Sequence, residues 1–149
     1  MDVNAKHDFR RTQTMRLLRA LVEANSNIMK LDEVQIRTYG LASSEFDGLV
    51  TLGVDQPLRM CDLAQRSLLT KSHTTQVVKQ LEAKGLVNRQ RSRESEREVF
   101  VSLTPAGEAL FKRVYPAHYE FLKGLFLNRL TPAEQERLIE LLCKLAVEE

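Results

Sequence analysis

Hydrophobic residues in the first forty positions recur close to the 3.6-residue period of an α-helix. No Gly or Pro interrupts residues 8–38, so this stretch is predicted to form one helix, about 45 Å long at 1.5 Å per residue. The residues of its apolar pattern are Leu18, Leu21, Val22, Ile28 and Met29. Such a helix is longer than the core of a small domain needs, so we expect it to pack against something else. Gly40 ends it, because glycine accepts the left-handed conformation that follows a last helical turn.

Shorter elements follow this helix. A second helix is predicted over residues 43–53, an extended piece at Leu58–Arg59 after a proline, and a short helix over residues 61–67.

The next helix has two distinct faces. It is predicted over residues 71–84, because Thr70 suits an N-cap and Gly85 stands where a helix C-cap belongs. One face, expected to be buried, consists of Thr74, Val77, Val78 and Leu81. The other consists of Ser72, Thr75, Gln76 and Lys79. This second face carries hydrogen-bonding groups and a cation but no carboxylate.

A β-hairpin is predicted after Gly85. Residues 86–91 and 98–103 form its strands, the second being β-branched and aromatic, and the charged residues 92–97 form its exposed turn.

Two more helices are predicted at the C-terminus. The first begins at Thr104-Pro105 and is expected to kink or break at Pro116, because proline removes a backbone donor and clashes one turn back.

The last helix begins with a capping box at residues 131–134, where Thr and Glu each satisfy a backbone N–H group. Its apolar stripe, predicted to be buried, consists of Leu138, Leu141, Leu142 and Leu145.

Composition and charge narrow the class of protein. The 149 residues, 43% hydrophobic and 28% charged, are typical of one globular domain, and a polar N-terminus without a long apolar run predicts a cytoplasmic protein with no membrane association. Residues 59–98 carry nine basic and five acidic side chains, whereas each flank has a net charge of −1. Residues 71–93 contain six basic side chains and only one acidic side chain. A basic centre between acidic flanks indicates a polyanionic partner.

Metal, cofactor and catalytic chemistry are not indicated. Cys61 and Cys143 have no metal or redox spacing, and three histidines are spread over different elements, so we predict no metal and no cofactor. An enzyme is disfavoured, because there is no nucleophile–base motif or Gly-rich phosphate loop. His118 is expected to be a core histidine, with a ligand-pocket or metal role as the alternative. Cys143 is expected to pack in the core. Cys61 is expected to be a small buried residue, with a redox-active thiol at a helix N-terminus as the alternative.

The order of elements predicts a winged helix-turn-helix. In such a unit the second helix enters the major groove of DNA, and the hairpin, or wing, reaches the neighbouring minor groove. The predicted fold class is mainly α with a small β-hairpin wing, flanked by N- and C-terminal helices.

Four segments carry a resemblance to a known family: YGLASSEFD at residues 39–47, LA at 63–64, LEAKGLV at 81–87 and VSLTPAG at 101–107. In this order and spacing they resemble the MarR family of bacterial and archaeal transcription regulators, over nearly the whole chain. The resemblance implies a single MarR-like domain, residues 1–149. Its residues 8–38 and 104–149 would be dimerisation helices, and residues 43–103 would be the DNA-binding lobe.

The resemblance also implies a function. A homodimer would bind a pseudo-palindromic site on double-stranded DNA, and binding would be relieved by a small ligand or by oxidation. The leading hypothesis is a repressor released by a small aromatic or amphipathic effector. The alternatives are a thiol-redox-responsive regulator acting through Cys61 and a helical protein-interaction module.

Candidate site residues follow from the predicted helix and wing together with the resemblance. The candidate DNA-binding residues are Lys71, Ser72, His73, Thr75, Gln76, Lys79, Arg89, Arg91, Arg93 and Arg97. The resemblance also implies an effector pocket between the lobe and the dimerisation helices, and its candidate residues are Tyr39, Phe46, Tyr115 and Tyr119.

Two positions depart from the pattern of the family. The wing of the family often carries Asp-x-Arg, whereas this chain has Ser95-Glu96-Arg97, so Glu94 or Glu96 would replace the aspartate or the wing would be looser. The frequent Thr at the start of the second helix is Ala42 here, and Ser43 is expected to cap that helix instead.

Overall fold

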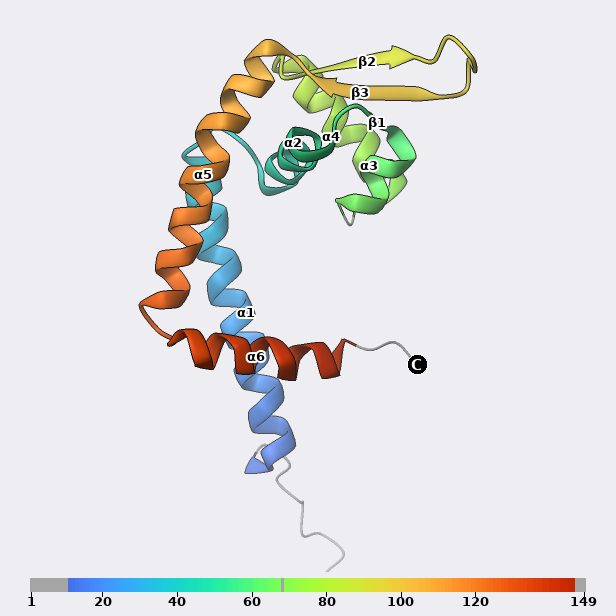
Figure 1. Ribbon diagram of the computed structural model, residues 1–149. Helices are drawn as coiled ribbons and strands as arrows, with labels where there is room; N and C mark the ends of the chain where they lie inside the picture. Colours follow the sequence, from blue (N-terminus) through green and yellow to red (C-terminus); the bar gives the residue numbers. More distant parts are fainter. Residues whose placement is uncertain (1–10, 68, 147–149) are drawn as a thin grey trace, which may run out of the picture.

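The computed structural model describes residues 11–67 and 69–146 (Figure 1). In chain order its elements are α1 (Gln13–Arg37), α2 (Ser43–Asp55), β1 (Leu58–Arg59), α3 (Met60–Arg66), α4 (Lys71–Ala83), β2 (Val87–Arg91), β3 (Val99–Leu103), α5 (Pro105–Leu127) and α6 (Pro132–Leu145). This is the order that the sequence predicts, and the mainly helical fold with a small β-hairpin is confirmed.

The long first helix begins later than predicted. Within the described residues α1 starts at Gln13, where the Thr12 hydroxyl accepts a hydrogen bond from the Met15 N–H at 3.4 Å. The predicted residues 8–10 lie outside the described residues. The predicted end is confirmed, because Gly40 has a φ of 78° in the turn between α1 and α2.

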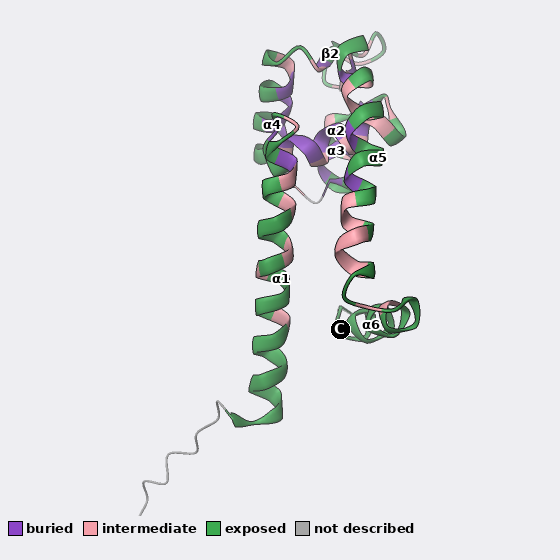
Figure 2. Ribbon diagram, turned by 90° about the vertical axis from the view of Figure 1, so that its left-hand side faces the viewer, coloured by how far each residue is buried: buried purple, intermediate pink, exposed green. Residues whose placement is uncertain are grey.

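The hydrophobic core lies in the compact lobe formed by α2, α3, α4 and the sheet, where the buried residues of Figure 2 gather. Leu49, Leu52, Val78, Leu81 and Val101 have no exposed surface. The helices contribute faces with a 3.6-residue period and β3 contributes alternate residues. Together they fix the orientation of α4 relative to the sheet.

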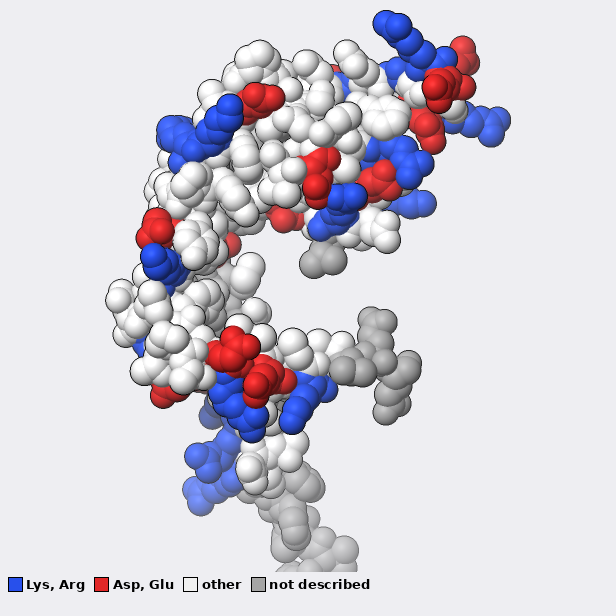
Figure 3. All heavy atoms as spheres, viewed as in Figure 1, with Lys and Arg blue, Asp and Glu red and all other residues white. Residues whose placement is uncertain are grey.

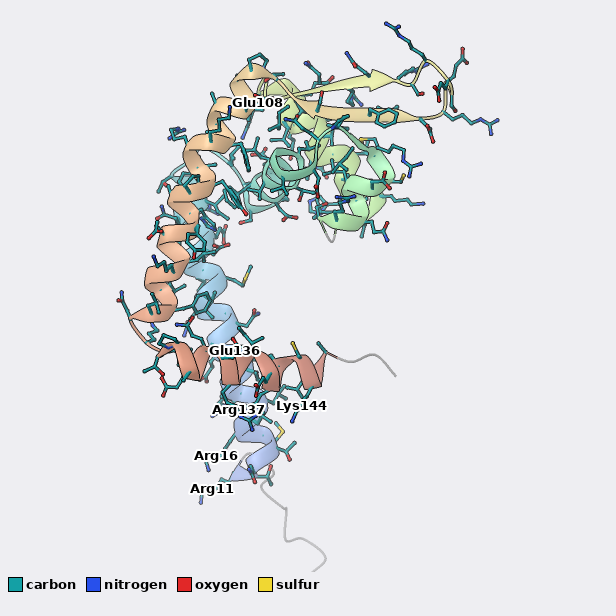
Figure 4. All side chains as sticks on the ribbon, in the orientation of Figure 1. Arg11, Arg16, Glu108, Glu136, Arg137 and Lys144 are labelled. Atoms are coloured by element: carbon teal, nitrogen blue, oxygen red, sulfur yellow. The ribbon has the colours of Figure 1, made fainter. Side chains whose placement is uncertain are left out.

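The sheet has three antiparallel strands in the order β1-β3-β2. Leu58 pairs with Val101, and Val87 pairs with Leu103. The Gln56 side chain closes one end of the sheet. Its oxygen accepts from the Leu103 N–H at 2.7 Å, and its nitrogen donates to Glu108 at 3.2 Å. Figure 4 shows Glu108 at the start of α5. These bonds join the end of α2 to the start of α5.

Helix α5 continues through Pro116 from Pro105 to Leu127, so a break at this residue is excluded, while a kink there stays a prediction. Pro116 and Lys112, one turn earlier, are both exposed. Water can therefore solvate the carbonyl group that the proline leaves without a donor.

Helix α6 begins with the predicted capping box. The Thr131 hydroxyl accepts from the Glu134 N–H, and a Glu134 oxygen accepts from the Thr131 N–H at 2.8 Å. These hydrogen bonds from Thr131 lower the pKa of the Glu134 carboxyl. Ala42, not Ser43, is the N-cap of α2, and its N–H donates to Glu45 Oε2 at 2.9 Å. The prediction that Ser43 caps this helix is therefore wrong.

The leucines of α6 are exposed in the single chain. The prediction that they are buried is therefore wrong for a single copy of the protein. The exposed fractions are 40% for Leu138, 43% for Leu141, 41% for Leu142 and 63% for Leu145. Only Ile36 of α1 is buried. Figure 2 shows α6 and most of α1 lying apart from each other and outside the lobe, whereas the end of α1 at Ile36 packs against the core. No helix among the described residues is long and apolar enough to cross a membrane.

Candidate nucleic-acid interface

Helix α4 is fixed in the lobe by one face and exposes the other. The Thr70 hydroxyl caps it by accepting from the His73 N–H at 3.3 Å, and the predicted buried stripe from Thr74 to Leu81 is confirmed. The exposed residues include every candidate that the sequence places on this helix: Lys71, Ser72, His73, Thr75, Gln76 and Lys79. Because no carboxylate lies among them, this face can approach the phosphates of a nucleic acid without like-charge repulsion.

The polar groups on this face differ in how they are engaged. Thr75 donates its hydroxyl proton to the Lys71 carbonyl at 3.1 Å, and the hydroxyl groups of Ser72 and Thr70 lie 3.3 Å apart. Gln76 makes no hydrogen bond to any described residue. Its amide group can therefore offer both a donor and an acceptor to a base edge.

The wing is a closed loop on two paired strands. The Ser92 N–H donates to the Glu98 carbonyl at 2.8 Å, and the Glu98 N–H donates to the Ser95 carbonyl at 3.2 Å. A bond from the Glu94 N–H to the Ser92 hydroxyl at 3.2 Å completes the turn. This geometry holds the arginines of the loop away from the core.

The arginines of the wing fall into two groups. Arg89 on β2 pairs with Glu82 of α4, with Nη2 2.7 Å from Oε2. Arg91, Arg93 and Arg97 are exposed and pair with no described carboxylate. Figure 3 shows Lys and Arg side chains projecting from the wing end of the lobe, with acidic side chains among them. Three wing cations are thus available to phosphates, while Arg89 joins the wing to α4.

Several charged contacts were not predicted from the sequence, and the first joins Glu45 to Lys84. Glu45 is 5% exposed and accepts from Lys84 Nζ at 2.6 Å, and the same ammonium donates to the Gly40 carbonyl at 3.0 Å. These bonds tie the end of α4 to the turn after α1. The residues lie about forty positions apart, so no local spacing marks them.

The second missed contact surrounds Arg59. Its Nε donates to Asp62 Oδ2 at 2.8 Å, and its Nη1 lies 3.4 Å from Glu98 Oε1. The hydrogen bond from Arg59 lowers the pKa of the Asp62 carboxyl. The i, i+3 spacing of Arg59 and Asp62 at the start of a helix was a usable signal for the first contact.

An aromatic cluster joins the lobe to the long helices. The ring of His118 on α5 lies 4.5 Å from that of Phe46 on α2 and 6.0 Å from that of Tyr39. His118 is 7% exposed, and its Nε2 lies 2.9 Å from Asp32 Oδ1 on α1. Its Nδ1 atom is buried and has no hydrogen-bond partner among the described residues. His118 is therefore a core residue, as expected, but only one of its two nitrogens is paired.

The four effector candidates do not form one group. Tyr39 and Phe46 stack with their centroids 5.8 Å apart. Tyr115 instead stacks on Phe111 at 5.1 Å, and it is 44% exposed. Tyr119 lines a separate groove of about 420 Å³. The other residues of that groove are Leu122, Lys123, Phe126, Leu127 and Gln135.

Both cysteines are free and exposed. The expectations that Cys143 packs in the core and that Cys61 is buried are therefore wrong for the single chain. Cys61 lies in the first turn of α3 with its sulfur 3.9 Å from Asp62 Oδ1. Cys143 lies on α6, no residue of which is buried.

A capped helix with a polar, carboxylate-free face beside an arginine-bearing hairpin defines a winged helix-turn-helix protein. The sequence model of the MarR family matches residues 41–99. The chain is 31% identical over 120 residues to the HTH-type transcriptional regulator YwaE of Bacillus subtilis, covering 79% of this chain and 68% of that protein. The chain belongs to the MarR family of transcriptional regulators.

Other relatives agree over most of the chain. The HTH-type transcriptional regulator YkoM of Bacillus subtilis is 27% identical, over 91% of this chain and 87% of its own length. Sco3205, a MarR family transcriptional regulator of Streptomyces coelicolor solved in complex with DNA, is 28% identical. Its TM-score is 0.82, and the match covers 91% of this chain and 87% of that one. The winged helix-turn-helix fold is therefore confirmed.

Proposed function

We propose that this protein is a homodimer that binds a pseudo-palindromic site on double-stranded DNA and represses transcription. Helix α4 lies in the major groove, where Ser72, Thr75 and Gln76 contact base edges. Lys71, His73 and Lys79 contact phosphates beside it. The observation that carries the proposal is the face of α4 formed by these six residues, which are all exposed, include no carboxylate and adjoin the wing.

The wing supplies the second contact. Arg91 and Arg93 neutralise phosphates, and Arg97 enters the minor groove, whose negative potential is strongest where A·T tracts narrow it. Arg89 acts by holding the wing against α4 through Glu82. That Sco3205, with the same fold and 28% identity, was solved with DNA supports this mode of binding.

The apolar faces of α1 and α6 support the dimer. Each of these helices exposes several large hydrophobic side chains outside the lobe, and monomeric proteins seldom leave such groups uncovered. In the proposed dimer residues 8–38 and 104–149 interdigitate with those of the second copy, and residues 43–103 form each DNA-binding lobe. A two-fold dimer places its half-sites about 34 to 36 Å apart, one turn of DNA.

Repression is relieved by a small aromatic or amphipathic effector at the junction of the lobe and the long helices. Support comes from Tyr39 and Phe46, whose rings stack there beside the unpaired Nδ1 of His118. Tyr115 and Tyr119 lie outside this cluster and contribute less. The protein acts on the chromosome, so its place is the cytoplasm, and its role includes no catalysis.

Fluorescence anisotropy against DNA from upstream of the protein's own gene and against scrambled DNA, at several salt concentrations, tests the proposal. We expect the upstream DNA to bind at least 10³-fold more tightly. Gln76→Ala should lower the affinity for that DNA by about 1 to 3 kcal/mol and leave binding to scrambled DNA unchanged. Absence of binding to either DNA at low salt would contradict the proposal.

A further inference from the structure

The loop that carries Arg97 is tied to the helix-turn-helix by one side chain. Glu98 closes the loop with its backbone, which bonds to Ser92 and Ser95. Its carboxylate lies 3.4 Å from the guanidinium of Arg59. Arg59 belongs to β1, where it pairs with Phe100 of β3, and it is also held by Asp62 of α3.

The Arg59–Glu98 contact differs from the one that the resemblance to the family implies for this wing. In the family pattern an aspartate within the wing holds the arginine, and here that position is Ser95. Neither Glu94 nor Glu96 pairs with Arg97 among the described residues. The loop is instead closed by Glu98, the neighbour of Arg97, and fixed from outside by Arg59.

The wing is held on both of its strands. On the β3 side the contact is Arg59–Glu98, and on the β2 side it is Arg89–Glu82, with the carboxylate on α4. The two contacts orient the hairpin relative to α3 and α4. A rigid hairpin lowers the conformational entropy that is lost when Arg97 enters a groove.

We propose that Arg59 is a positioning residue for DNA recognition, which orients the wing through Glu98 so that Arg97 reaches the minor groove. The inference rests on the proposed function. Exposed ion pairs contribute little to folding stability. We therefore expect the Arg59–Glu98 contact to affect DNA binding and the preference for narrow A·T grooves.

The direction in which Glu98→Gln changes DNA affinity distinguishes a positioning role from a purely electrostatic effect. Removing a carboxylate near DNA normally strengthens binding to every sequence, because repulsion from the phosphates decreases. Glu98→Gln removes a charge but also releases Arg59. We therefore expect weaker binding. Glu96→Gln is the matched control, since Glu96 lies two residues away, is exposed and pairs with no described residue.

The full-length protein is first used to select 30-base-pair duplexes, about three helical turns long, from a random pool. The best duplex is then made with A·T-rich and with G·C-rich flanks under the wing. Anisotropy titrations measure both affinities for each variant, and melting temperatures confirm that each variant folds.

We expect the wild type to prefer the A·T-rich flanks and Glu98→Gln to bind them about five- to tenfold more weakly, with little change for the G·C-rich flanks. Glu96→Gln should bind both duplexes more tightly. Arg59→Gln should lower the preference as Glu98→Gln does, and the double variant should bind the A·T-rich flanks no more weakly than either single variant, because both residues act through one contact.

Two results would overturn the inference and leave DNA binding intact. In one, Glu98→Gln strengthens binding to both duplexes as Glu96→Gln does. In the other, the wild type selects a sequence but ignores its flanks. A wild type that selects no sequence would overturn the proposed function and the inference together.

Discussion

The Nε2 atom of His118 on α5 lies 2.9 Å from Oδ1 of Asp32 on α1, although the two residues are 86 positions apart. The imidazole ring also packs against the rings of Phe46 and Phe121, with centroids 4.5 Å and 5.9 Å away. This contact joins the two long helices at the level of the lobe. Removing this contact is therefore expected to lower the free energy of unfolding of the whole chain.

His118→Ala should lower the free energy of unfolding by about 2 to 4 kcal/mol, because it leaves a cavity among aromatic rings and removes the partner of Asp32. Guanidinium unfolding at one fixed protein concentration measures it. Glu120→Ala, an exposed position on the same helix, is the control and should change stability by less than about 0.5 kcal/mol. Equal effects of the two substitutions would contradict the assigned role of His118.

Gly107 has no room for a side chain. A Cβ atom there would lie 2.0 Å from the Leu86 carbonyl oxygen, a backbone atom that cannot move away cheaply. Gly107→Ala should therefore destabilise the protein by about 2 to 3 kcal/mol. Gly124→Ala on the same helix meets nothing within 4 Å and should stabilise it by up to about 1 kcal/mol through helix propensity. Thermal unfolding of both variants checks the difference in sign.

The elements of the lobe were predicted well because short sequence patterns mark where each element begins and ends and which face it buries. Thr70 and Gly85 delimit α4 through capping chemistry, and a 3.6-residue period separates its buried face from its exposed one. Contacts between distant residues have no such signal. The Arg59–Glu98 pair spans 39 positions, and the rings around His118 come from separate elements.

The leucines of α6 illustrate a different limit. A period of 3.6 residues identifies an apolar face but not the surface that covers it. Leu138 to Leu145 follow the period and yet stay exposed in one chain. The predicted interruption of α5 at Pro116 was wrong for a related reason, since the cost of an interior proline depends on whether solvent reaches the freed carbonyl.

Burial raises the pKa of the Asp47 carboxyl on α2. A carboxyl whose pKa is higher in the folded state favours folding below its ordinary pKa, and this contribution is lost as the pH rises through the folded value. Asp47→Asn should therefore raise stability at pH 7, and the difference should disappear at acidic pH. Asp62 has a lowered pKa, so Asp62→Asn should have the opposite sign. Unfolding at a series of pH values measures both.

Arg93 is exposed at the wing and pairs with no described carboxylate. Arg93→Ala should weaken binding to all DNA sequences and reduce the slope of log affinity against log salt by about 0.9, the value for one phosphate contact. Arg16→Ala removes the same charge at the far end of α1 (Figure 4), where no DNA contact is proposed. Titrations at four salt concentrations should leave the slope of that control unchanged. An unchanged slope for Arg93→Ala would remove it from the interface.

The exposed stripe of α6 should control assembly. Leu142 is 41% exposed beside Leu138 and Leu141, which lie one turn and one residue away on the same face. In the proposed dimer Leu142→Lys would bury an unpaired ammonium group, so the dissociation constant should rise by about 30-fold or more.

Sedimentation measures this constant, and DNA affinity should fall with it because two lobes bind one site. Glu136→Lys places a lysine on the opposite, exposed face of the same helix and should leave the dimer intact. If Leu142→Lys sediments as the wild type does, α6 lies outside the interface, and the leucine stripe needs another partner.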